Sequence, residues 1–296
     1  MPQLSRVKVA GYLTFLILIW GINWPLSKFA LAYAPPILFA GLRTFVAGII
    51  LLAFALTRYK QLRFKETWPI YVLASVLNIV LYYGFQTVGL QYMPAGLFSA
   101  IVFFQPVLLG IFSWLWFGEM MYGLKMVGLL LGFAGVSVMS IGGFSGNISG
   151  WGIILAIASA LSWAMGSLYM KKQAAQVDSV WMTTMQMLIG GIVMLASGSF
   201  MESWADIVWS SSFIGVTLFI SVFVIALGWL VYFTLIGTGE ASKVGSFTFL
   251  IPVVSILISV MFFHEKVTAS LLTGLVLIAF SILFVNVKPK RYRLQA

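Results

Sequence analysis

The sequence predicts an all-α integral membrane protein in which ten transmembrane helices form two inverted five-helix repeats. Three observations predict this fold class. Of 296 residues, 61% are hydrophobic and only 8% are charged, whereas soluble domains carry about 25% charged residues. Apolar runs long enough to cross a bilayer recur along the whole chain. Features of the first half also return in the second half at a nearly constant separation.

Composition excludes several classes of protein. The chain has no cysteine, which excludes disulfides, thiolate metal sites and cysteine nucleophiles. Its first hydrophobic run is too long for a signal peptide and lacks a small-residue cleavage pattern, so we expect no cleaved leader. The net charge of +10 is better explained by basic cytoplasmic loops than by nucleic-acid binding. We therefore expect membrane lipid, and no nucleic acid, around this chain.

Ten apolar runs of about 20 residues predict the membrane spans. They lie near 9–32, 36–57, 69–90, 95–117, 124–143, 151–170, 179–200, 212–236, 242–263 and 268–287. Ten spans place both termini on one side of the membrane. If that side is the cytoplasm, its segments hold 14 of the 17 basic residues, the others being Lys28, Lys266 and Arg43. The positive-inside rule then predicts that the N-terminus and the C-terminus are both cytoplasmic.

An internal repeat divides the chain into residues 1–146 and 147–296, two halves of one membrane domain. A shift of 146 residues pairs Pro106 with Pro252, Glu119 with Glu265, Gly128 with Gly274 and Tyr83 with Trp229, and a shift of 143 pairs Trp20 with Trp163. Because five spans is an odd number, the second half must enter the membrane upside down relative to the first. Inverted repeats of this kind are typical of secondary transporters with a midplane site.

Three stretches carry a resemblance to a known family: "LIWGINWPLSKFAL", "FGEMMYGLKMVGLLLGFAGV" and "FHEKVTASLLTGLVLIAFSI". They resemble the EamA-type repeats of the drug/metabolite transporter superfamily, and the overall pattern is similar to bacterial aromatic amino-acid exporters of the YddG type. The resemblance covers nearly the whole chain. It implies ten helices around a central cavity and export of metabolites from the cytoplasm across a bacterial inner membrane. The second copy differs, with His264 preceding Glu265 where the first has Gly118, and its first helix lacks counterparts of Asn23 and Pro25.

The first span contains residues that are unusual in a lipid-facing helix. Pro25 removes a backbone donor and frees the carbonyl of Gly21, a break that is tolerated where it faces protein or water. One interpretation is a bent helix, hinged at Pro25, that presents Trp20 and Asn23 to a substrate. The other is an interfacial tryptophan belt with a kink at the helix end. Under the first interpretation, Trp20 and Asn23 meet the cavity more readily than Trp24.

Polar residues form a stripe along the third span, where Tyr71, Ser75, Asn78, Tyr82 and Gln86 recur at helical spacing. A stripe that faced lipid would be costly. It therefore either lines a cavity or joins helices through hydrogen bonds. Asn78, Tyr82 and Gln86 are candidate substrate-binding residues.

Further candidates lie on the sixth and eighth spans. Trp163 and Ser167 share a face of small and polar residues, a pattern that also suits close helix packing. Trp229 and Tyr232 form an aromatic pair that either contacts substrate or packs in the interior.

Two prolines mark possible hinges at repeat-equivalent positions within the fourth and ninth spans. Pro106 and Pro252 either allow alternating access or form static kinks that fit neighbouring helices. Gln105, beside Pro106, is a candidate substrate contact.

Three charged residues lie near or within the predicted spans, and two roles are open for the one inside a span. Arg43 lies well inside the hydrocarbon, where it recognises a substrate carboxylate or is tied to backbone carbonyls near a helix break. Glu119 and Glu265 lie at span ends, where we expect each to cap the helix that follows.

Missing motifs narrow the function. The chain has no G-x4-GK[ST] phosphate loop, so ATP does not drive it directly. It has no dense cluster of metal ligands, and we expect no enzymatic activity, metal or cofactor. No carboxylate lies within a predicted span, which favours facilitated transport over obligatory proton coupling. A single intramembrane arginine argues against polyanionic cargo.

Sequence and resemblance together predict a secondary transporter that exports amino acids, aromatic or hydrophobic ones above all, or similar small metabolites by alternating access. The alternatives are a multidrug organic-cation exporter of the same superfamily, a channel and a non-transporting membrane scaffold. The pair Gly128 and Gly132 fits close helix contact within a monomer or across a homodimer.

Overall fold

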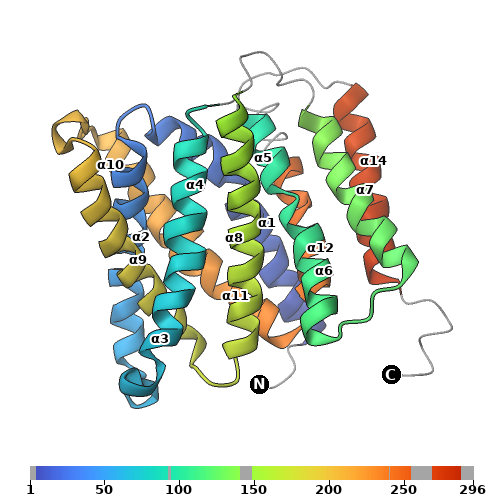
Figure 1. Ribbon diagram of the computed structural model, residues 1–296, viewed down its shortest axis with the longest axis horizontal. Coiled ribbons are helices and arrows are strands. Elements are labelled where there is room, and N and C mark those ends of the chain that lie inside the picture. The colour runs from blue at the N-terminus through green and yellow to red at the C-terminus, as the bar shows by residue number, and fades with distance from the viewer. Residues whose placement is uncertain (1–4, 93–94, 141–148, 240, 255–268, 288–296) are drawn as a thin grey trace.

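The computed structural model describes residues 5–92, 95–140, 149–239, 241–254 and 269–287, in which every regular element is a helix (Figure 1). The first half contains α1 (Arg6–Ala30), α2 (Pro36–Leu56), η1 (Tyr59–Gln61), α3 (Phe64–Ser75), η2 (Val76–Leu81), α4 (Tyr82–Gly89), α5 (Ala95–Val102), α6 (Gln105–Phe117) and α7 (Gly123–Ser140). The second half contains α8 (Gly150–Gln173), α9 (Ser179–Met201), η4 (Trp204–Asp206), α10 (Ser211–Phe219), η5 (Ile220–Leu227), α11 (Gly228–Thr238), α12 (Ala241–Thr248) and α14 (Ala269–Asn286).

Six helices in the described residues are long and apolar enough to cross a membrane. They are Val7–Ala30, Pro36–Leu56, Phe64–Gly89, Gly150–Gln173, Ser179–Met201 and Ser211–Thr238. Four shorter apolar helices, Gln105–Phe117, Gly123–Val138, Ala241–Val254 and Leu272–Asn286, lie in the other predicted spans. The helix of the third predicted span begins at Phe64, five residues before the predicted start at residue 69. It includes Pro69 and the polar segment that precedes this proline.

Two of the long helices contain a π-helical segment, η2 between α3 and α4 and η5 between α10 and α11. A π turn shifts the hydrogen-bond register and leaves backbone carbonyls for other partners. Neighbouring helices use them: the Ser162 hydroxyl donates to the Leu77 carbonyl at 2.7 Å. The indole Nε1 of Trp20 likewise donates to the Val224 carbonyl at 3.1 Å.

Prolines shape three of the predicted spans differently. α5 ends at Val102 and α12 ends at Thr248, each four residues before a proline, Pro106 or Pro252. Proline has no N–H to bond the carbonyl four residues earlier, which accounts for both endings. α1, by contrast, continues through Pro25 to Ala30.

Glycines let α2 and α9 pack backbone against side chain. A Cβ built on Gly48 would lie 2.8 Å from the Leu188 side chain, and one on Gly191 would lie 2.7 Å from the Phe45 backbone. A similar contact joins α7 to α14, where a Cβ on Gly128 would meet Phe284 at 2.9 Å. Gly132 faces Phe249 and Ser281 of the same chain. The glycine pair of α7 is therefore used for packing within the protomer.

Charged groups join α2 and α9 at both ends, which shows that the two helices are antiparallel. The Glu202 carboxylate, just after α9, accepts the backbone N–H groups of Ile37 and Leu38 at 2.9 and 2.7 Å. At the other end Asp178 caps α9 and pairs with Arg58 at 3.0 Å. Anions at helix N-termini satisfy free N–H groups and the helix dipole.

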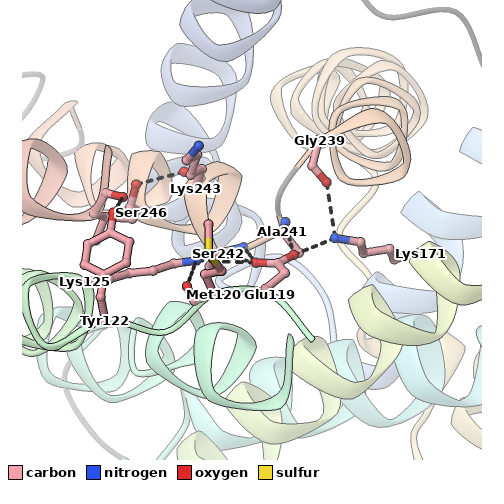
Figure 2. A network of polar contacts seen from close by, with 11 residues as sticks. Glu119, Met120, Tyr122, Lys125, Lys171, Gly239, Ala241, Ser242, Lys243 and Ser246 are labelled. Atoms are coloured by element: carbon pink, nitrogen blue, oxygen red, sulfur yellow. Dashed lines mark hydrogen bonds and ion pairs between the residues drawn. The ribbon is translucent and has the colours of Figure 1, made fainter. Parts of the chain in front are cut away.

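Glu119 joins three helices at one end of the bundle (Figure 2). It follows Gly118, which caps the C-terminus of α6 in the left-handed conformation with φ 62°. Its carboxylate accepts the N–H of Ala241 at 2.8 Å and the hydroxyl of Ser242 at the start of α12, as well as Lys171 Nζ from α8 at 2.6 Å. Lys125 of α7 pairs with it at 3.7 Å.

The prediction that Glu119 caps the helix following it in the sequence was therefore wrong about which helix is capped. Glu119 caps α12, which is distant in sequence, and not α7, the helix that follows. The reason is that the end of α6 lies beside the start of α12, and α12 has no acidic residue in its own first turn. Glu265 lies outside the described residues.

Glu119 supports a prediction about the pH dependence of stability. Burial by itself raises the pKa of this carboxyl, but hydrogen bonds from Lys171 and Ser242, the Lys171 charge and the Ala241 N–H outweigh burial and lower the pKa below 4.5. The stabilisation is present above the ordinary carboxyl pKa and is lost as the pH falls through the lowered value. Glu119→Gln should lower the free energy of unfolding by about 2 kcal/mol at pH 7.

Thermal unfolding in detergent, followed by tryptophan fluorescence at pH 7 and near pH 3, measures this effect. The difference from wild type should shrink at the lower pH. Glu66→Gln is the matched control, because the Glu66 side chain is 71% exposed and pairs with Arg63 at 3.6 Å. Such surface pairs contribute about 0–1 kcal/mol. Equal losses of unfolding free energy in Glu119→Gln and Glu66→Gln would contradict the prediction that the Glu119 contacts stabilise the protein.

Helix packing gives a second prediction, in which one substitution has opposite effects at two sites. Gly191→Ala should lower the melting temperature because its Cβ meets the Phe45 backbone. Gly215→Ala in α10 should raise it slightly, because that Cβ meets nothing within 4 Å and alanine stabilises a helix by about 0.5–1 kcal/mol over glycine. The same unfolding measurement tests both, and a stabilised Gly191→Ala variant would contradict the close contact.

Candidate functional site

Aromatic side chains enclose a small cavity where α1, α4, α8, η5 and α11 meet. Its lining consists of Trp20, Asn23, Trp24, Tyr82, Tyr83, Phe103, Trp163, Val224, Trp229 and Ile251. The centre of a water molecule can occupy only about 20 Å³ of it, which is room for about one water. The rings therefore nearly fill the cavity, and a larger guest requires them to move.

Trp20 lies at the centre of the aromatic cluster. Its ring centroid is 5.6 Å from that of Trp163, 5.5 Å from that of Trp229 and 5.1 Å from that of Tyr232. Tyr82 closes the other side, 5.3 Å from Trp163 and 5.8 Å from Trp229. Tilted and edge-to-face arrangements at these distances are favourable for aromatic pairs.

Two pairs of residues that the sequence repeat relates are in direct contact here. Trp20 and Trp163 meet edge to face at an interplanar angle of 67°. Trp229 donates its indole N–H to the Tyr83 hydroxyl at 2.6 Å across 146 residues of sequence. Residues related in this way can touch only where the two halves of the chain meet, so the cavity lies between the halves.

A chain of hydrogen bonds fixes the Tyr232 ring behind the cavity. Gln105 Nε2 donates to the Tyr232 hydroxyl at 3.3 Å, and that hydroxyl lies 3.0 Å from Ser167 Oγ. Ser167 donates in turn to the Trp163 carbonyl at 2.7 Å, so the Tyr232 hydroxyl donates to Ser167. Gln105, Ser167 and Tyr232 thus hold the aromatic cluster through hydrogen bonds and are not among the residues that line the cavity. Their role in substrate contact stays a prediction.

Arg43 connects to the lining through Ser27. Its Nη1 donates to Ser27 Oγ at 3.0 Å, and Ser27 donates to Asn23 Oδ1 at 3.0 Å. The guanidinium also lies over the rings of Phe39 and Tyr83, at 4.9 and 4.5 Å from their centroids. The sequence allowed two roles for Arg43, recognition of a substrate carboxylate or hydrogen bonds to backbone carbonyls. In the described residues Arg43 makes no hydrogen bond to a backbone carbonyl.

Asn78 and Gln86 do not line the cavity. Asn78 donates from Nδ2 to Gln186 Oε1 of α9 at 3.1 Å, and it lies against Gly166 of α8. Gln86 is buried, and its Oε1 has no hydrogen-bond partner among the described residues. A role for either residue in substrate contact stays a prediction. The stripe on the third span therefore divides, with Tyr82 in the cavity and Asn78 between helices.

Several lining residues did not stand out in the sequence. Phe103, Val224 and Ile251 are ordinary apolar residues in the sequence. The sequence favours Trp20 over Trp24 as a cavity residue, but both line the cavity. Tyr83 was visible only as the repeat partner of Trp229. In the described residues no group of three or more His, Asp or Glu side chains is placed to hold a metal ion.

Comparison with known proteins gives a consistent result. The EamA-like transporter family matches residues 9–141 and, separately, residues 150–287. The uncharacterized transporter YvbV of Bacillus subtilis is 58% identical over 296 residues, covering 100% of this chain and 97% of its own. A protein of Escherichia coli named "Probable amino-acid metabolite efflux pump" is 27% identical over 306 residues, covering 96% of each chain.

A solved crystal structure of another protein shares the fold. Its TM-score against this chain is 0.82, and the match covers 95% of this chain and 97% of the other at 21% sequence identity.

The contact between Tyr83 and Trp229 gives a prediction about the cluster. Tyr83→Phe keeps the ring but leaves the buried Trp229 N–H without an acceptor, which should cost about 1–3 kcal/mol. Thermal unfolding in detergent measures the loss. Tyr12→Phe is the control, because Tyr12 is 36% exposed on α1. Unchanged stability of Tyr83→Phe would show that this hydrogen bond does not hold the two halves together.

Proposed function

The chain belongs to the EamA-like transporter family, and on that premise we propose that it exports amino acids with aromatic or other hydrophobic side chains, or similar small metabolites, as a secondary transporter that works by alternating access. The family and the named relatives indicate a transporter and not an enzyme. With its apolar helices, the chain is a multi-pass membrane protein whose environment is lipid and whose partner is a small-molecule substrate.

The proposed architecture has ten spans in two inverted repeats, residues 1–146 and 147–296, with both termini cytoplasmic in a bacterial inner membrane. The family's two successive matches support the repeat, as do the π-helical segments and proline breaks that recur in each half. The contacts between Trp20 and Trp163 and between Tyr83 and Trp229 support an axis that passes through the cavity. The concentration of basic residues supports the orientation.

The observation that carries the proposed substrate class is the aromatic lining of the cavity. Apolar and aromatic walls with a few fixed polar groups are typical of small-molecule sites. Indole and phenol rings bury the apolar body of a substrate, while Asn23 and Tyr82 provide polar atoms in the same lining. The printed name of the Escherichia coli relative supports amino-acid metabolites as the cargo.

Alternating access fits the closed state of the cavity. With room for about one water, the site must open before substrate enters, and the Glu119 network joins α7, α8 and α12 at one end of the bundle. Pro106 and Pro252, which follow the ends of α5 and α12, are the proposed hinges, together with Pro25 in α1. Motion there changes the angle between helix segments without breaking further backbone hydrogen bonds.

An organic-cation exporter is the second candidate function. Aromatic rings attract cations through their faces, and the cavity has such rings on several sides. A competition assay separates the two candidates, because an amino-acid carrier discriminates against cations that lack a carboxylate.

Uptake into liposomes tests the proposal. Purified protein should take up labelled phenylalanine saturably, without an ion gradient, and excess unlabelled phenylalanine should compete. Trp163→Ala should lower the initial rate at least about tenfold, because lost ring contacts weaken binding by more than 1.4 kcal/mol. Trp151→Ala is the matched control on the same helix, since Trp151 is 67% exposed and Trp163 only 2%.

Two results would contradict the proposal. The first is the absence of saturable uptake both without a gradient and with an imposed proton gradient. The second is an equal loss of rate in Trp151→Ala and Trp163→Ala, which would show that transport does not depend on the cavity. Conductance without saturation would indicate a channel.

A further inference from the structure

Arg43 is a buried cation whose charge the described part of the chain does not match. The residue is 1% exposed, and no carboxylate pairs with it among the described residues. Its Nε and Nη2 atoms are buried and have no hydrogen-bond partner in the part of the chain that the structure describes. An unpaired charge inside a membrane protein is costly and marks a functional position by default.

The unpaired atoms form one edge of the guanidinium. Nη1 is occupied by Ser27, which leaves Nε and Nη2, the adjacent pair whose N–H groups point the same way. This edge matches the two oxygens of a carboxylate and forms a bidentate, charge-assisted pair. The neighbouring rings of Phe39 and Tyr83 hold the guanidinium plane in place.

Arg43 also orients the polar lining of the cavity. Ser27 accepts from Arg43 and therefore donates to Asn23 Oδ1, so the Asn23 carbonyl faces Ser27 and its NH₂ group is the part left for a guest. The other polar groups of the lining include the Trp24 indole N–H and the Tyr82 hydroxyl, and none of the described lining residues is Asp or Glu. The site therefore presents donors and a nearby positive charge.

We infer that the site recognises the carboxylate of its substrate through Arg43, and that it selects monocarboxylates with an aromatic or apolar body whether or not they carry an ammonium group. The inference rests on the proposed function and narrows its substrate class. Asn23 and Tyr83 separate the guanidinium from the present cavity. Because the cavity must widen to admit a guest, recognition through Arg43 requires that displacement of either side chain lets the guanidinium reach the substrate.

A ligand series tests this inference without depending on transport. Purified protein is unfolded thermally with equal concentrations of phenylalanine, N-acetylphenylalanine, which lacks the ammonium, or phenethylamine, which lacks the carboxylate. A ligand that binds the folded state raises the melting temperature. The two carboxylates should stabilise the protein, and their affinities should exceed that of phenethylamine at least about tenfold, the effect of losing one charge-assisted pair.

Variants assign the effect to Arg43. Arg43→Gln should abolish the preference for carboxylates, and Arg43→Lys should retain part of it because the charge stays while the bidentate edge is lost. Lys65→Gln is the matched control, since it removes an exposed positive charge beyond the cavity. Ser27→Ala, a milder change, should weaken carboxylate binding and covers the case in which the Arg43 variants do not fold.

Three results would overturn the inference: phenethylamine binding as tightly as phenylalanine, no binding by any of the three ligands, or a carboxylate preference that survives in Arg43→Gln. Failure of the proposed function is a separate result. It would appear as carboxylate-selective binding with no uptake into liposomes, which would leave Arg43 as the binding residue of a protein that does not carry phenylalanine.

Discussion

Hydrocarbon offers no hydrogen-bond partner, so polar groups within the bundle must find partners in the chain itself. The free N–H groups at the start of α2 and α12 receive the carboxylates of Glu202 and Glu119. The carbonyls that the π-helical segments release receive Ser162 and Trp20. Each of these partners comes from the other half of the chain, so the requirement for satisfied polar groups also joins the two halves.

Acidic and basic groups are distributed differently along the bundle. Near its ends, Glu119 and Asp178 are paired with lysine or arginine, and Glu119 has several donors at once. At the centre, the described residues of the cavity lining provide aromatic rings and hydrogen-bond donors but no carboxylate. Arg43 stands beside that lining with one edge unused. Charges are thus paired near the ends of the described bundle, while one edge of Arg43 has no partner among the described residues beside the cavity lining.

The closed cavity and the tight helix contacts constrain how this chain could move. The α2/α9 and α7/α14 pairs approach so closely at Gly48, Gly191 and Gly128 that these helices would move together as rigid units. The aromatic cluster, by contrast, is held by ring contacts and a few hydrogen bonds that can re-form with a guest. Motion of rigid helix pairs around an adaptable aromatic centre is consistent with the proposed alternating access.

By itself, the sequence determined the helical membrane class, the position of nearly every described helix and the residues at which two spans are broken. Hydropathy and proline chemistry act locally, so they need no knowledge of neighbours. The repeat also paired Trp20 with Trp163 and Tyr83 with Trp229, and each pair is in contact in the structure. Only the tertiary structure decided that Glu119 caps α12, that Asn78 packs between helices while Tyr82 lines the cavity, and that one edge of Arg43 is free. Periodicity identifies which face of a helix is polar, but the helix that meets this face is set by packing between segments far apart in the chain.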